Sequence, residues 1–93
     1  MAEEEFYDIA ARKLVRKYEG VIGQAAEGIA KKDDHVEFED GEIKSFSGGS
    51  GELDELVQAY EDTIGNVALR LAKQVIADVE GSDEADLPDR LKK

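Results

Sequence analysis

Residues 35–46 read HVEFEDGEIKSF, and this stretch decides the fold expected of the chain. Apolar and polar residues alternate on both sides of Asp40-Gly41, which is typical of half-buried β-strands. Asp-Gly is favoured in the two-residue turns of hairpins, because both central residues of a type I′ turn need a positive φ. The sequence therefore predicts an antiparallel hairpin with its turn at Asp40-Gly41.

A two-residue turn at this point also predicts which residues of the two strands lie opposite each other. The expected pairs are Glu39 with Glu42, Phe38 with Ile43, Glu37 with Lys44, and Val36 with Ser45. Val36, Phe38 and Ile43 then share a buried face, with Glu37 and Lys44 paired outside. Phe46 points to the opposite face unless a bulge turns it inward.

The segments on either side of the hairpin carry apolar residues at helical spacing. Residues 3–32 predict one amphipathic helix with an apolar stripe about 140° wide. Residues 51–79 predict a second helix, capped by Ser50 and ended by Gly81. Gly65 lies inside it, either to let another helix approach closely or as a tolerated glycine that costs about 1 kcal/mol relative to alanine. No internal repeat is identified.

The apolar stripe of the second helix widens along its length, from about 100° to about 200°. One partner helix and one hairpin leave part of that surface uncovered, and an isolated two-stranded sheet is only marginally stable. We therefore expect an α+β domain of order helix, β-hairpin, helix (αββα) over residues 1–81, completed by homodimerisation. Residues 82–93 are expected to form a polar, flexible C-terminal tail.

Composition limits the kind of protein. The 93 residues include 23 acidic and 12 basic side chains, a net charge of −11, and no cysteine. Disulfides, thiol nucleophiles and cysteine-ligated zinc are therefore excluded. No apolar run is long enough for a membrane helix, and residues 1–5 lack the positive charge of a signal peptide, so a cytoplasmic protein is expected. The acidic composition resembles that of proteins from halophilic archaea, although lysines outnumber arginines here.

One basic cluster lies on the polar face of the first predicted helix, and it consists of Arg12, Lys13, Arg16 and Lys17. Such a cluster is a candidate contact for nucleic acid or for another anionic partner. Ion pairs at helical spacing, Asp8 with Arg12 and Arg16 with Glu19, would neutralise part of it. Nucleic-acid binding is thus an alternative, not the first expectation.

Two further motifs have alternative interpretations. Residues 47–51, SGGSG, precede a helix as phosphate-binding loops do, but the Walker lysine is missing and the acidic residues that follow would repel phosphate. A capped connector is expected, with a small-ligand or enzymatic role as the alternative. His35 is the only histidine, and beside Asp33, Asp34 and Glu37 it is either part of a charged loop or of a weak cation site.

The functional expectation follows mostly by elimination. Adjacent carboxylates carry little information about acid–base catalysis in a chain that has 23 of them. A serine nucleophile would have only one imidazole as its base. We therefore expect no catalytic, metal or cofactor site. The sequence favours a non-catalytic protein-interaction or regulatory module that works through the outer face of the hairpin and the acidic start of the second helix.

Overall fold

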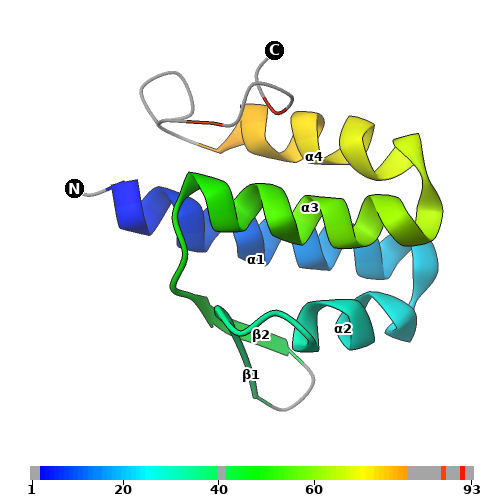
Figure 1. The fold of residues 1–93 in the computed structure, drawn as a ribbon, viewed down its shortest axis with the longest axis horizontal. Helices are drawn as coiled ribbons and strands as arrows, with labels where there is room; N and C mark the ends of the chain where they lie inside the picture. Colours follow the sequence, from blue (N-terminus) through cyan, green and yellow to red (C-terminus); the bar gives the residue numbers. More distant parts are fainter. Residues whose placement is uncertain (1–2, 40–41, 80–86, 88–90, 92–93) are drawn as a thin grey trace.

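The computed structural model describes residues 3–39, 42–79, 87 and 91. Its fold is α+β, with the elements in the order helix, helix, hairpin, helix, helix along these residues (Figure 1). They are α1 (Glu3–Ile22), α2 (Gln24–Lys31), β1 (Val36–Glu39), β2 (Glu42–Phe46), α3 (Ser50–Ile64) and α4 (Asn66–Asp78). The predicted hairpin between helical segments is confirmed.

Each of the two long helices predicted from the sequence is broken at a glycine. Gly23 has φ 67° and Gly65 has φ 77°, a left-handed conformation that ends a right-handed helix and that glycine adopts at little cost. The prediction of two continuous helices was therefore wrong. Both alternatives considered for Gly65 were wrong: a Cβ atom there would meet nothing within 4 Å, so no helix approaches it closely, and the residue ends α3 instead of lying inside a helix. Its backbone conformation, and not a close neighbour, requires glycine.

The two breaks lie at equivalent points of an internal repeat, which the sequence reading missed. Residues 14–31, LVRKYEGVIGQAAEGIAK, align without gaps with residues 56–73, LVQAYEDTIGNVALRLAK. Nine positions are identical: Leu14/Leu56, Val15/Val57, Tyr18/Tyr60, Glu19/Glu61, Ile22/Ile64, Gly23/Gly65, Ala26/Ala68, Ala30/Ala72 and Lys31/Lys73. The hairpin is inserted between two helix–glycine–helix units.

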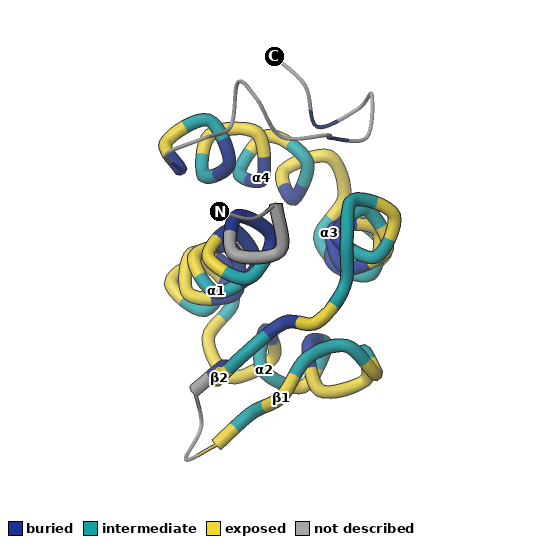
Figure 2. The backbone as a smooth tube through the Cα atoms, turned by 90° about the vertical axis from the view of Figure 1, so that its left-hand side faces the viewer, coloured by how far each residue is buried: buried dark blue, intermediate teal, exposed yellow. Residues whose placement is uncertain are grey.

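The elements pack in three layers (Figures 1 and 2). α1 and α3 lie side by side in the middle, α4 covers them on one side, and α2 with the hairpin covers them on the other. The residues with buried side chains lie on the parts of the backbone next to the space between the layers. The largest fully buried ones are Tyr18, Tyr60, Leu14, Leu53, Leu56, Ile76, Leu91, Val15 and Val57. Because α4 turns back onto α1, a single chain covers much of the wide apolar stripe on which the homodimer prediction was based. Homodimerisation itself stays a prediction.

The strand register departs from the prediction at one residue. Phe38 pairs with Ile43 and Glu39 with Glu42, as expected, but a bulge shifts the next pairs to Glu37 with Ser45 and Val36 with Phe46. The extra residue, Lys44, lies instead 3.3 Å from a carboxylate oxygen of Glu39. The bulge turns the Phe46 side chain inward, where it is buried with Ile43. The predicted turn at Asp40-Gly41 lies outside the described residues.

The start of α3 also differs from the prediction. Gly49 and not Ser50 is the N-cap, and the Gly49 N–H donates to the Glu52 side chain at 2.7 Å. The predicted end at Gly81 and most of the predicted tail lie outside the described residues. Two tail side chains, Leu87 and Leu91, belong to the hydrophobic core. No helix among the described residues has both the length and the apolar character needed to span a membrane.

Candidate functional site

Two tyrosines, one from each repeat, occupy the centre of the molecule. The rings of Tyr18 and Tyr60 are fully buried and stacked, with centroids 4.0 Å apart and planes at 24°. The Tyr18 hydroxyl donates to the carbonyl of Ala68 at 2.7 Å, and the Tyr60 hydroxyl donates to that of Ala26 at 2.6 Å. Each hydroxyl therefore binds the first turn of the helix that follows the glycine in the other repeat.

Burial of the tyrosine pair changes the acidity of Tyr60. Burial, and secondarily the neighbouring Tyr18 and Glu19, raise the pKa of Tyr60 well above its usual range. The hydroxyl therefore stays protonated and acts as a hydrogen-bond donor. The third tyrosine, Tyr7, is buried as well.

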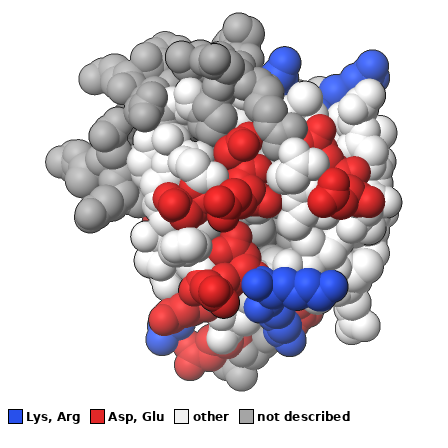
Figure 3. Space-filling view, viewed as in Figure 1, with Lys and Arg blue, Asp and Glu red and all other residues white. Residues whose placement is uncertain are grey.

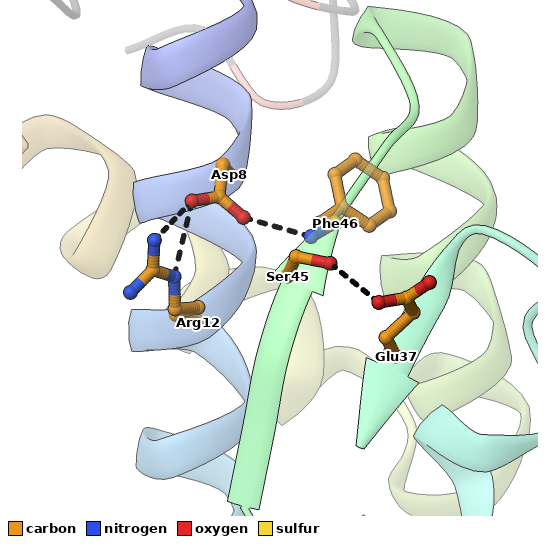
Figure 4. A network of polar contacts seen from close by, with 5 residues as sticks. All are labelled: Asp8, Arg12, Glu37, Ser45 and Phe46. Carbon is orange, nitrogen blue, oxygen red and sulfur yellow. Dashed lines mark hydrogen bonds and ion pairs between the residues drawn. The ribbon is translucent and has the colours of Figure 1, made fainter. Parts of the chain in front are cut away.

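The basic cluster predicted on the first helix is only partly available, because Arg12 binds Asp8. The guanidinium donates to one oxygen of the Asp8 carboxylate, which raises the pKa of Arg12. The other oxygen accepts the backbone N–H of Phe46 at 2.7 Å (Figure 4). Asp8 and Arg12 therefore join α1 to β2, at the strand residue that the bulge turns inward.

The other three residues of the cluster, Lys13, Arg16 and Lys17, are exposed on α1. Asp8 and Arg12 pair as predicted, whereas the ion pairs found among the described residues do not include one between Arg16 and Glu19. Binding of nucleic acid at this face stays a prediction, now with three contact residues in place of four.

Replacing Asp8 with alanine is expected to lower the free energy of unfolding by about 2 kcal/mol, because the Phe46 N–H loses a charged acceptor. Arg12→Ala removes only a part-buried ion pair near the surface and is expected to cost under about 1 kcal/mol. Urea denaturation of the two variants makes the comparison. Equal losses would show that the ion pair, and not the bond to the strand, stabilises this contact.

A pocket of about 480 Å³ opens between α3 and the segment that joins α2 to the hairpin. Its lining includes the carboxylates of Asp33, Asp34, Glu55 and Asp62. Ile29, Ala59 and Thr63 add apolar surface, and Lys32 and His35 supply the basic groups. Figure 3 shows the acidic side chains gathered over the face where α3 lies, with basic side chains at the edge near α2.

Local hydrogen bonds hold the wall of the pocket that precedes the hairpin. One oxygen of Asp33 accepts the backbone N–H of His35 at 2.9 Å and lies 3.2 Å from the Nδ1 atom of the same residue. The carbonyl of His35 accepts the backbone N–H of Ser47 at 2.8 Å. The wall is thus tied to the end of the hairpin.

The weak cation site considered around His35 is not assembled. Glu37 lies on β1, where its carboxylate accepts the Ser45 hydroxyl at 3.3 Å, and it does not line the pocket. Within the described ranges, no three histidine, aspartate or glutamate side chains are grouped so that they could hold a metal ion.

The Gly/Ser loop is packed against its neighbours. A Cβ atom on Gly48 would lie 2.3 Å from the Cβ of Glu52 and 2.9 Å from the Cζ of Phe46. The Gly49 N–H that a phosphate would need is already bound to Glu52, and this bond lowers the pKa of the Glu52 carboxyl. The contact therefore stabilises the fold above the unfolded-state pKa of Glu52 and is lost as the pH falls through the lowered value.

The pocket residues on α3 were missed by the sequence reading. Glu55, Ala59 and Asp62 are spaced by four and three residues, so they share one helical face. This spacing was a usable signal, but the opposite wall comes from residues 32–35 and depends on how α2 packs.

No protein-family model matches the chain, and neither the curated proteins nor the solved structures contain a match to it.

Proposed function

We propose that the protein is a non-catalytic interaction module whose acidic pocket binds a positively charged segment of a partner protein. The observation that carries the proposal is the pocket of about 480 Å³ with four carboxylates in its lining. Its volume is typical of ligand sites, which range over about 300–1,000 Å³. It lies between α3, which contributes Glu55, Ala59, Asp62 and Thr63, and the segment that leads into the hairpin.

The chemistry of the lining favours an arginine or lysine side chain. Carboxylates bind guanidinium groups with strong, charge-assisted hydrogen bonds. Ile29 and Ala59 offer apolar surface to the aliphatic stem of such a side chain. The net charge of −11 attracts a basic partner from a distance, although salt screens this attraction. In the salty cytoplasm that the composition suggests, contacts within the pocket would therefore provide most of the affinity.

The proposal is tested by titrating the ¹⁵N-labelled protein with a short arginine-containing peptide and with the same peptide carrying glutamine in place of arginine. Only the first is expected to shift the amide signals of residues 32–35, 55, 59, 62 and 63. Glu55→Gln and Asp62→Asn should each weaken binding about tenfold, because each removes one charge-assisted contact.

Asp78→Asn is the matched control, because it removes the same charge from an exposed position on α4. It should leave the affinity within about twofold, as expected for a distant and screened charge. If all three variants weaken binding equally, the peptide responds to net charge alone and the pocket is not the site. Shifts confined to residues 13–17 on adding duplex DNA would instead support the nucleic-acid alternative.

A further inference from the structure

α4 is joined to α3 by a single residue, Gly65. The two helices run antiparallel beside each other (Figure 1). The apolar spacing of residues 51–79, however, is that of one continuous helix. The chain is therefore compatible with two arrangements, one bent at Gly65 and one straight.

The contacts that hold α4 in the bent arrangement are almost all made by its side facing α1 and α3. Ala68, Ala72 and Ile76 are buried there, and the carbonyl of Ala68 accepts the Tyr18 hydroxyl. None of these contacts depends on α4 belonging to the same chain as α1. The α4 of a second copy can make the same contacts.

We propose that two copies of this chain exchange α4, with Gly65 as the hinge that straightens. In the exchanged dimer, α4 of each copy packs on α1 and α3 of the other, and Tyr18 of one copy donates to Ala68 of the other. Domain swapping of this kind reproduces the contacts of the monomer across the dimer and costs little.

The hinge region is also where two such acidic chains can meet with least repulsion. Residues 63–69, TIGNVAL, contain no charged side chain, although 38% of the whole chain is charged. Val67 within this stretch is 48% exposed, so it offers apolar surface to a second copy. Repulsion between the remaining charges is expected to make the exchange more favourable at high salt.

The test uses Gly65→Ala in the full chain. A Cβ atom at this position meets no neighbour, so the substitution penalises the positive φ of the bent form and favours the helical conformation of the straight form. Together these effects favour a straight hinge by at least about tenfold per chain. With two hinges in each dimer, the dimerisation constant should rise on the order of 100-fold in sedimentation equilibrium. Gly28→Ala, at a helical position that is equally open, should leave it unchanged.

A distance measurement separates exchange from ordinary association. The natural chain has no cysteine, so spin labels can be placed at Gln58→Cys and Asp78→Cys, both exposed positions. Labelled protein is diluted with unlabelled protein, so that most dimers contain one labelled chain and the measured distance is that between the two labels of this chain. A straight helix separates these positions by about 30 Å, whereas in the bent form they lie on antiparallel neighbouring helices.

Dimers of Gly65→Ala with the intrachain distance of the bent form would overturn the proposal, as would a variant that stays monomeric at every concentration and salt level. If Gly65→Ala does not fold, the spin-labelled chain with the natural Gly65 provides the second measurement. After refolding at high concentration in about 2 M KCl, where charges are screened, it should contain a dimer fraction with the straight-helix distance. The absence of that fraction would equally overturn the proposal.

Discussion

Replacing Tyr60 with alanine is expected to lower the free energy of unfolding by about 4 kcal/mol, as large-to-small changes of buried aromatic residues do. The substitution removes a fully buried ring that stacks on Tyr18 at 4.0 Å. It also removes the hydroxyl that donates to the carbonyl of Ala26. Because the ring lies between the two repeats, the loss should appear as a shift of the whole cooperative transition in urea denaturation.

Milder variants divide this effect into its parts. Tyr60→Phe keeps the ring and should cost about 1 kcal/mol, the typical net contribution of one hydrogen bond. Tyr18→Phe should behave alike, and a double-mutant cycle measures the coupling of the two hydroxyls. Val21→Ala, at a position that is 50% exposed, is the control and should cost under about 1 kcal/mol. A loss from Tyr60→Ala no larger than this control would contradict the central role of the pair.

The tyrosine pair also predicts how the fold responds to alkali. Because folding raises the pKa of Tyr60, its contribution to stability is complete below the ordinary tyrosine pKa of about 10. It is lost as the pH rises from there towards the raised value, since the unfolded chain releases that proton first. Tyrosinate absorbance from this residue should therefore appear only together with unfolding.

The helix breaks show what sequence periodicity cannot supply. Gly20 and Gly28 lie within helices without breaking them, whereas Gly23 and Gly65 end theirs. Residue type alone does not separate the two kinds. The apolar spacing does not either, because the helices on both sides of each break turn apolar faces towards the core. The break is specified by tertiary packing, in which each tyrosine hydroxyl binds the helix that follows the other repeat's glycine.

More detail of the hairpin could be predicted from the sequence, because the signals that specify its strands and residue pairs are local. Asp40-Gly41 and the alternation around it predicted the strands and the two pairs nearest the turn. The bulge between Phe38 and Glu37 was not predictable, since it depends on α1, where Asp8 binds the N–H of Phe46. The pocket is likewise predictable only in part. The spacing of residues on α3 predicts one wall, whereas the other wall depends on how α2 packs. The repeat of residues 14–31 in residues 56–73 was also accessible to sequence reasoning, although it was missed.

The loop between the hairpin and α3 provides the second large expected effect. Gly48→Ala should lower the free energy of unfolding by about 2 kcal/mol, in the range seen when an extra methyl group is forced into a packed site. The new Cβ would lie 2.3 Å from the Cβ and 2.8 Å from the Cγ of Glu52, and 2.9 Å from the Phe46 ring. The Cβ of Glu52 is fixed to the helix backbone, so the loop itself must shift.

Gly51→Ala is the matched control, three residues further along and already in α3. A Cβ atom there meets nothing within 4 Å, and alanine in a helix is favoured over glycine by about 0.5–1 kcal/mol. The two variants should therefore change the stability in opposite directions, as measured by urea denaturation. A shifted loop should also lengthen the bond from Gly49 to Glu52, which amide hydrogen exchange at Gly49 would detect. If Gly48→Ala is as stable as Gly51→Ala, the loop has room to move, and its close contact with Phe46 and Glu52 does not determine where α3 begins.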